Sequence, residues 1–254
     1  MKLSLVFPVY KKEDVVSKQV LRLYRYLEKM GISFEFILVI DGIIDDTKLM
    51  LEMFIIVKEL KNVRVVSYRD NRGKGYAVRY GMKYATGDIV GFTDADTDIL
   101  PESLGTALRA IEKDGIDMVA PSKLHFKSNA KLNFKRKVFS AGLRTINRIF
   151  LKQPKNVKDI AGGLKLFTRE AAKQIFPNLK VDRFAMDSEI FYFVEKNKLK
   201  VAITPIYLNR QSKSTSANIK QILIMLKDII GLSLEIRFAE LSKIKNIALK
   251  PFRM

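Results

Sequence analysis

The chain has 254 residues, of which 46 are lysine or arginine, 27 are aspartate or glutamate and one is histidine, so its formal net charge is +19. There is no cysteine, which excludes disulfide bonds and thiolate metal sites, and the single histidine excludes a histidine-pair zinc site. The charge requires an anionic partner, and nucleic acid, an anionic bilayer surface and phosphorylated substrates all satisfy that requirement.

Neither a signal peptide nor a transmembrane helix is expected. The N-terminal apolar run is too short for a signal peptide and contains Pro8. The longest apolar stretch, residues 221–238, is interrupted by Lys227, Asp228 and Glu235. A membrane-spanning helix needs about 18 or more apolar residues without charge, so this stretch does not qualify.

Short apolar runs alternate along the chain with segments of helical periodicity. The pattern predicts strands at residues 3–9, 34–40, 63–68, 89–93, 116–121, 162–167 and 201–209, and helices at residues 13–30, 47–60, 74–85, 101–113, 131–152, 169–175, 186–196, 219–238 and 240–249. Such alternation is typical of a doubly wound, mostly parallel α/β sheet that is covered on both faces. Pro205 places the last strand at an edge. We expect one core domain, residues 1–214, and a C-terminal appendage of basic amphipathic helices, residues 215–254.

The predicted strand 89–93 ends in three carboxylates at alternate positions, Asp94, Asp96 and Asp98. Without compensation these carboxylates would repel one another, so a divalent cation is the simplest occupant. Oxygen ligands favour Mg²⁺ or Mn²⁺, and such an ion in turn suggests a diphosphate ligand. The alternative is a solvated acidic turn before the helix that starts at Pro101.

Other polar groups follow neighbouring strands, and ligands of doubly wound sheets bind at the carboxyl ends of strands. Asp41 follows one strand, and the segment from Asn71 to Ala77 precedes a helix with two glycines around Lys74. The helix N-terminus and Lys74 favour a phosphate group there, although the segment is not a Walker A loop. A plain glycine turn that caps a helix is the alternative.

Several motifs together resemble a known family. The chain carries, in order, Phe7-Pro8-Val9-Tyr10, Asp41-Gly42, Asn71-Arg72-Gly73-Lys74-Gly75-Tyr76-Ala77, Gly87-Asp88 and Asp94-Ala95-Asp96, and later Asp159-Ile160-Ala161-Gly162-Gly163-Leu164-Lys165-Leu166-Phe167, Phe184-Ala185-Met186-Asp187-Ser188-Glu189 and Ser212-Lys213. The first set resembles family 2 glycosyltransferases of the GT-A fold. The second is similar to their polyprenyl-phosphate subgroup, which includes dolichyl-phosphate mannose synthase and dolichyl-phosphate glucosyltransferase.

The resemblance implies roles for individual residues. It implies donor binding by Pro8, Tyr10, Glu13, Asp41, Asn71, Lys74, Gly75 and Asp94, metal binding by Asp94, Asp96 and Asp98, and catalytic roles for Asp96, Asp159 and Asp187. The family's Asp-Asp-Gly-Ser pattern is reduced here, because Ile40 and Ile43 stand where it has aspartate and serine. For Asp41, a turn before Gly42 is the alternative, and for Pro8 and Tyr10 it is packing at the strand end. For Asp159 it is capping of a helix or turn.

A basic amphipathic helix is predicted at residues 131–152, with one apolar stripe and one cationic face. Such a helix favours a membrane surface or another polyanion, while an ordinary surface helix is the alternative. Similar proteins have Ser-Arg-Gly where this chain has Ser140-Ala141-Gly142, so the arginine that holds the acceptor phosphate is absent there. We expect Lys123, Arg136 or Arg144 to take its place in acceptor binding, with Ser140. The two C-terminal helices are interpreted as interfacial, with packing on the core or dimerisation as the alternative.

The resemblance implies an inverting, metal-dependent hexosyltransferase. We expect it to move a hexose from a nucleotide sugar of the GDP-mannose or UDP-glucose type to a polyprenyl phosphate, as a peripheral protein on the cytoplasmic face of a membrane. A phosphate acceptor has a second pKa of about 6 and needs little help from a general base. One alternative is a hydroxyl acceptor on a glycan or lipid. A nucleic-acid-binding module is a remote alternative, because it leaves the acidic cluster unexplained.

Overall fold

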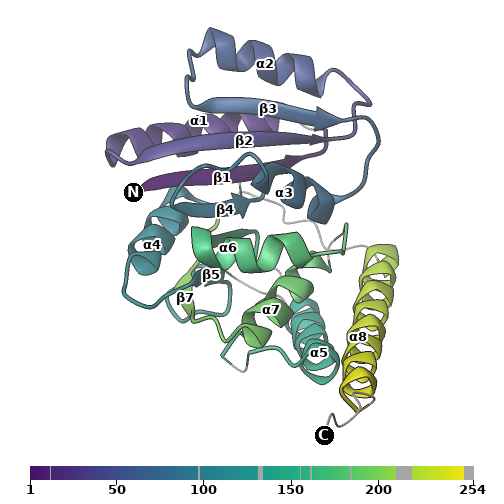
Figure 1. Ribbon diagram of the computed structural model, residues 1–254. Helices are drawn as coiled ribbons and strands as arrows, with labels where there is room; N and C mark the ends of the chain where they lie inside the picture. Colours follow the sequence, from purple (N-terminus) through teal and green to yellow (C-terminus); the bar gives the residue numbers. More distant parts are fainter. Residues whose placement is uncertain are drawn as a thin grey trace, which may run out of the picture.

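The computed structural model describes residues 1–11, 13–96, 98–130, 134–154, 156–160, 162–183, 185–209 and 219–248, with side chains omitted at 134–139, 219–222 and 239–248. The strands are β1 Lys2–Val9, β2 Ser33–Asp41, β3 Val63–Tyr68, β4 Ile89–Thr93, β5 Met118–Ser122, β6 Leu164–Thr168 and β7 Val201–Pro205. The helices are α1 Glu13–Lys29, α2 Thr47–Val57, α3 Lys74–Met82, α4 Pro101–Ile111, α5 Phe134–Leu151, α6 Arg169–Ile175, α7 Met186–Lys196 and α8 Ile219–Ala248, with a short 3-10 helix, η1 Phe176–Asn178. These elements form the expected α/β architecture (Figure 1).

Within the described residues, seven strands form one sheet in the order β3-β2-β1-β4-β6-β5-β7. β1 pairs in parallel with β2 and β4, and β2 pairs in parallel with β3. The central strands are buried along almost their whole length, which explains why their sequences are apolar throughout. The carboxyl ends of β1 to β4 therefore meet at one edge of the sheet.

β6 is the exception to the parallel arrangement, because it pairs antiparallel with both β4 and β5. β5 ends at Ser122 on the carboxyl edge, and the connection from there to β6 contains α5. β6 therefore starts at the same edge of the sheet at which β5 ends, so β6 runs antiparallel to β5. β7 lies at the end of the strand order, as the proline within it predicts.

Apolar cores lie on both faces of the sheet. One core is formed with α1, α2 and α4, and the other with α3, α6 and α7. A third, smaller core joins α5, α7 and α8, where Ile229 and Leu232 of α8 are buried. Figure 1 shows α8 lying beside α5 at the margin of the molecule.

The C-terminal part differs from its prediction in one respect. A single helix, α8, covers the described residues 219–248, where two helices were expected. Neither glycine nor proline stands near Ala239, so nothing in the sequence interrupts the helix there. The inner face of α8 packs on the core, while Leu223 and Phe238 are 61% and 70% exposed. The predicted domain boundary at residue 214 lies outside the described residues.

None of the helices in the described part of the chain is both long and apolar enough to span a bilayer.

Candidate active site

Asp94 lies at the carboxyl end of β4, held from two sides. Its backbone N–H donates to the carbonyl of Gly163 at 2.7 Å, and the Lys74 Nζ donates to its Oδ1 at 2.6 Å. A Cβ on Gly163 would come within 2.0 Å of the Asp94 Oδ2. A side chain at position 163 would therefore displace the Asp94 carboxylate from its position beside Lys74. The backbone thus fixes a carboxylate beside the lysine of the Asn71–Ala77 loop.

Asp96 lies two residues beyond Asp94 and is exposed as a residue, while its carboxyl group is partly desolvated by the surrounding protein atoms. Burial, with the charges of Asp94 and Asp98 in addition, raises the pKa of Asp96 to about 6. The contribution of Asp94 and Asp98 to this shift means that the negative charge at this strand end is incompletely compensated. A divalent cation would compensate it, so the donor set fits Mg²⁺ or Mn²⁺. In the described residues, however, no three carboxylate or histidine groups already converge as a metal cage.

A second ion pair lies beneath this strand end, between Lys165 of β6 and Asp187 of α7. The Lys165 Nζ donates to the Asp187 Oδ1 at 2.7 Å and to the Gly162 carbonyl at 2.8 Å. The Lys165 side chain is fully buried. The ring centroid of Phe92 lies 5.6 Å from the Lys74 Nζ and 5.4 Å from the Lys165 Nζ.

The two pairs interact electrostatically. Burial lowers the pKa of Lys74, but the charges of Asp94 and Asp187 outweigh it, so the net pKa of Lys74 is raised. Lys74 therefore keeps its positive charge at neutral pH, as a phosphate ligand requires. The sequence indicated Asp187, but it did not indicate that Lys165 would be its partner.

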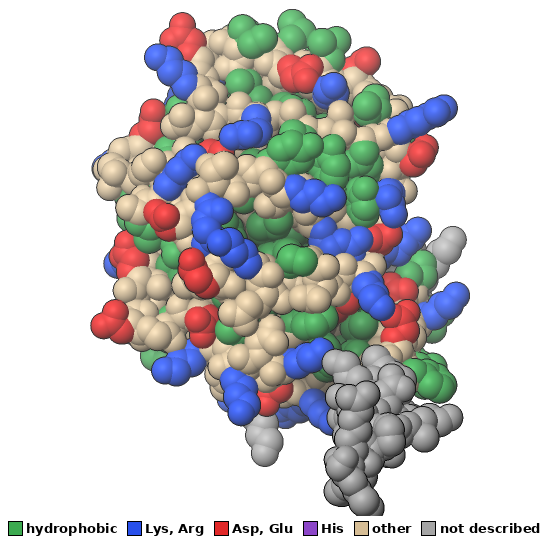
Figure 2. Space-filling view, viewed as in Figure 1, with side chains coloured by type: hydrophobic (Ala, Val, Ile, Leu, Met, Phe, Trp, Pro, Cys, Tyr) green, Lys and Arg blue, Asp and Glu red, His purple; other side chains and the backbone are tan. Residues whose placement is uncertain are grey.

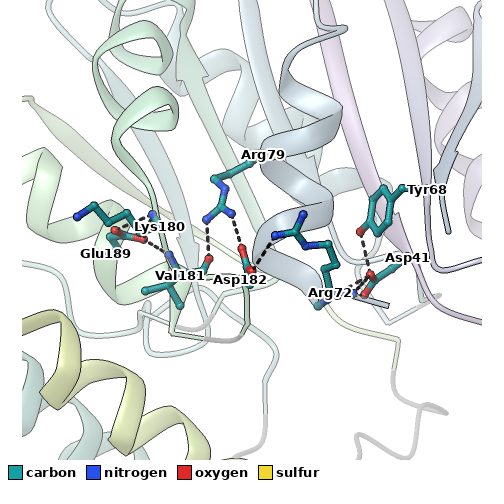
Figure 3. A network of polar contacts seen from close by, with 9 residues as sticks. Asp41, Tyr68, Arg72, Arg79, Lys180, Val181, Asp182 and Glu189 are labelled. Carbon is teal, nitrogen blue, oxygen red and sulfur yellow. Dashed lines mark hydrogen bonds and ion pairs between the residues drawn. The ribbon is translucent and has the colours of Figure 1, made fainter. Parts of the chain in front are cut away.

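Asp41 organises the loop that carries Lys74. Its carboxylate accepts hydrogen bonds from the backbone N–H groups of Arg72 (2.7 Å) and Gly73 (2.9 Å). It also accepts from the Asn71 Nδ2 at 3.0 Å and the Tyr68 hydroxyl at 2.8 Å (Figure 3). Asp41 is 4% exposed, so the structure places Asp41 and the Asn71 amide in the scaffold of the loop.

The same loop packs against the segment before α7. Gly73 has a φ of +104°, and a Cβ on it would come within 2.7 Å of the Asp182 carbonyl oxygen. A Cβ on Gly75 would come within 2.4 Å of the Val181 carbonyl oxygen. The two glycines thus allow backbone to lie directly on backbone, which a larger residue would prevent.

Side chains from α3 and from α7 bind this segment (Figure 3). The Arg79 guanidinium of α3 donates to the Val181 carbonyl at 3.0 Å and forms an ion pair with Asp182. The Asp182 carboxylate also lies 3.6 Å from the Arg72 guanidinium. From α7, Glu189 accepts from the backbone N–H groups of Lys180 and Val181, both at 2.9 Å. Burial raises the pKa of Glu189. A continuous polar network therefore links Asp41 to α7, and sequence reasoning did not find it.

The sequence profile of "Glycosyl transferase family 2" matches residues 4–176. The chain belongs to this family. A dolichyl-phosphate beta-glucosyltransferase of Dictyostelium discoideum is 29% identical over 241 residues, which are 90% of this chain and 72% of the relative. The protein of the same name from Drosophila melanogaster is 31% identical over 211 residues, 78% of this chain and 64% of the relative.

Solved structures show the same fold. Mannosyl-3-phosphoglycerate synthase from Rubrobacter xylanophilus superposes with a TM-score of 0.71 at 16% identity, over 100% of this chain and 77% of that one. Glucosyl-3-phosphoglycerate synthase from Mycobacterium tuberculosis, in complex with Mn²⁺, UDP and phosphoglyceric acid, superposes with a TM-score of 0.67 at 18% identity, over 92% and 77% of the two chains. At these identities the likeness concerns the fold alone.

The remaining residues that are predicted to bind the donor lie near the same edge. Pro8 is the second-last residue of β1. Tyr10 directly follows the strand and is 50% exposed. Glu13 starts α1, and its Oε2 accepts from the Thr47 hydroxyl at 3.4 Å. Tyr10 is thus open to a ligand, whereas Glu13 contacts the start of α2.

The predicted acceptor residues lie around the connection after β5. Asp159 accepts the backbone N–H of Lys123 at 2.7 Å, and Arg144 donates to the carbonyl of Lys158 at 3.3 Å. Lys123, Arg144 and Asp159 are therefore brought together. Ser140 is half-buried on α5, and the side chain of Arg136 lies outside the described residues. So do Ala161, Phe184 and the Ser212-Lys213 motif.

Proposed function

We propose that this glycosyltransferase moves a hexose from a nucleotide sugar to a polyprenyl phosphate at a membrane surface, with inversion at the anomeric carbon. The proposal that the protein binds a nucleotide sugar rests on the Lys74–Asp94 ion pair beside Asp96 at the carboxyl end of β4. A cation and a carboxylate cluster together match a diphosphate and its metal ion. The names of the relatives support the acceptor half.

The donor is assigned to the carboxyl edge of β1 to β4. Tyr10 is open to the base, and the loop that Asp41 holds presents Lys74 to the diphosphate. Asp94 and Asp96, with Asp98, would hold Mg²⁺ or Mn²⁺, and such an ion stabilises negative charge on the leaving diphosphate. The Mn²⁺ and UDP in the mycobacterial enzyme support this assignment.

The state of the candidate bases supports a phosphate acceptor over a hydroxyl. The Asp159 carboxylate accepts the Lys123 backbone N–H, and the Asp187 carboxylate is paired with Lys165. A hydroxyl acceptor needs a base that can take its proton. An ionised phosphate does not, because its second pKa is about 6. Asp159 therefore orients the acceptor side of the site in this proposal.

The donor is of the UDP-glucose type and not of the GDP-mannose type in this proposal, because the relatives are named glucosyltransferases. The protein binds peripherally to the cytoplasmic face. Its net charge of +19 supports attraction to anionic lipid headgroups. The exposed Leu223 and Phe238 of α8 offer apolar contact beside α5.

The test incubates the purified chain with UDP-[¹⁴C]glucose or GDP-[¹⁴C]mannose, Mg²⁺ or Mn²⁺, and either a polyprenyl phosphate or the free polyprenol. We expect label from UDP-glucose to become extractable into organic solvent only with the phosphate. Asp96→Ala is expected to abolish the transfer. Labelling of the free polyprenol instead would support the hydroxyl alternative, and no transfer to either would refute the proposal.

A further inference from the structure

A cavity of about 480 Å³ lies between α3 and the α6–η1 segment, on the face of the sheet away from α1. It lies toward the other edge of the sheet from the active site. Val90, near the start of β4, lines it, whereas Asp94 follows the end of the same strand. Arg169, which also lines it, directly follows β6, whose last residue pairs with Ile89. The cavity thus borders the loop that carries Lys74 through Tyr76, while the rest of its lining lies away from Asp94.

The walls of the cavity combine aromatic rings with positive charge. Tyr76 and Tyr80 of α3 and Phe176 of η1 contribute rings, and the remaining apolar lining includes Ala172. Arg79, Lys83, Arg169 and Lys173 also line it, and no aspartate or glutamate is among the described lining residues. Figure 2 shows lysine and arginine side chains around green, hydrophobic surface between α3 and α6.

Among the described residues, three of the four cations have no carboxylate partner. Arg79 forms an ion pair with Asp182, but in the described part of the chain no carboxylate lies within ion-pair distance of Lys83, Arg169 or Lys173. Like charges around an apolar hollow repel one another, and a bound anion relieves that repulsion. The volume lies in the range of small-molecule sites, roughly 300–1,000 Å³.

We propose that this cavity is a second ligand site, which binds a phosphomonoester of an apolar alcohol. The phosphate carries a charge of about −1.5 to −2 at neutral pH, which the lysines and arginines neutralise, and the apolar body packs on Tyr76, Tyr80 and Phe176. The site takes no part in the transfer reaction proposed above. The acceptor proposed above is also a phosphomonoester of an apolar alcohol, so the test of this site is the effect of variants that line the cavity, none of which is a predicted acceptor residue.

The probe is 1-naphthyl phosphate, titrated against the full chain and followed by naphthyl fluorescence. The chain contains no tryptophan, so the signal is free of indole emission. The main variant, Arg169→Ala/Lys173→Ala, removes two lining cations that lie four residues apart on α6. Its matched control, Arg25→Ala/Lys29→Ala, removes the same two residue types at the same spacing from the exposed face of α1.

We expect a saturable binding component that the α6 variant weakens about tenfold or more, because charge-assisted contacts are lost. The α1 control is expected to bind like the unmodified chain. Ala172→Leu, which fills the cavity without changing charge, is expected to weaken binding as well, and it keeps the test valid if the α6 variant does not fold. Equal weakening by the α1 control, or full binding by Ala172→Leu, would overturn the assignment.

A competition experiment tests whether the site requires an apolar body in addition to the phosphate group. Geranyl phosphate is expected to displace the probe, whereas inorganic phosphate at the same concentration is not, because it cannot use the aromatic wall. Displacement by inorganic phosphate alone at that concentration would refute the requirement for an apolar body. Absence of saturable binding by the unmodified chain would refute the site itself.

Discussion

Lys165 and Asp187 form an ion pair with a Nζ–Oδ1 distance of 2.7 Å, and their side chains are 0% and 8% exposed. Breaking such a pair on one side leaves a buried charge without a partner, which typically costs about 3–5 kcal/mol. We therefore expect Lys165→Met to lower the free energy of unfolding by about 3 kcal/mol or more. Urea unfolding followed by circular dichroism measures this loss.

The double variant Lys165→Met/Asp187→Leu is the control for that prediction, because it removes both charges together. It is expected to recover most of the lost stability but not the transferase activity, since Asp187 is a predicted catalytic residue whose charge also acts on Lys74. A double variant as unstable as the single one would show that the pair itself does not set the loss.

Gly163 is predicted to be indispensable for activity. In Gly163→Ala the new Cβ would meet the Asp94 Oδ2 at 2.0 Å, so Asp94 has to move away from Lys74. We expect kcat/KM to fall by roughly 100-fold, about 2.7 kcal/mol of lost transition-state stabilisation. Gly231→Ala on α8, where a Cβ meets nothing within 4 Å, is expected to leave kcat/KM unchanged. A Gly163→Ala enzyme of normal activity would contradict the fixed position of Asp94.

The sequence predicts most of the fold, with the single helix α8 and the direction of β6 as exceptions. Strands at residues 63–68 and 89–93 and helices at 169–175 and 186–196 have the predicted bounds, because turn residues or changes of periodicity delimit them. The direction of β6 was not predictable from its five residues. Direction depends on the edge at which the preceding chain ends, and that is set by the packing of α5 and not by any local pattern.

The candidate active site likewise contains residues whose positions the sequence predicts and residues whose positions it does not. Lys74, Asp94 and Asp96 stand at strand and helix ends, so their positions were predictable from the order of the elements. Lys165 was not, because a lysine between Leu164 and Leu166 also fits a strand with one solvated face. Arg79 and Asp182 are 103 positions apart, and no short motif indicates that they meet.

Asp41 is predicted to act on donor binding through the loop that it holds. Asp41→Asn replaces a carboxylate oxygen by an amide, so at least one of the N–H groups of Arg72 and Gly73 loses its acceptor. We expect the KM for the nucleotide sugar to rise by about tenfold, with a smaller change in kcat, because Lys74 is presented less often in its bound position. Asp70→Asn, an exposed change in the same loop, is the matched control in initial-rate kinetics. An unchanged KM in Asp41→Asn would show that the loop keeps its shape without the carboxylate.

Glu35 sets the acid stability of the fold from the opposite edge of the sheet. Burial raises the pKa of Glu35, but hydrogen bonds from Ser4 and Thr86 and the charge of Lys2 outweigh it and lower the pKa to about 2. Because the folded pKa lies below the unfolded value of about 4.3, the ionised carboxylate stabilises the fold above that pH. This stability is lost as the pH falls from about 4.5 toward 2, and the shift corresponds to about 3 kcal/mol.

Glu35→Gln is therefore expected to lower the free energy of unfolding by about 3 kcal/mol at pH 7 and to flatten its pH dependence between about 2 and 4.5. Urea unfolding at a series of pH values measures both effects. Glu28→Gln on the exposed face of α1 removes the same charge and is expected to leave the profile unchanged. If Glu35→Gln kept the acid-dependent loss of the unmodified chain, other carboxylates would have to account for it, and the network around Ser4 and Thr86 would have no part in acid unfolding.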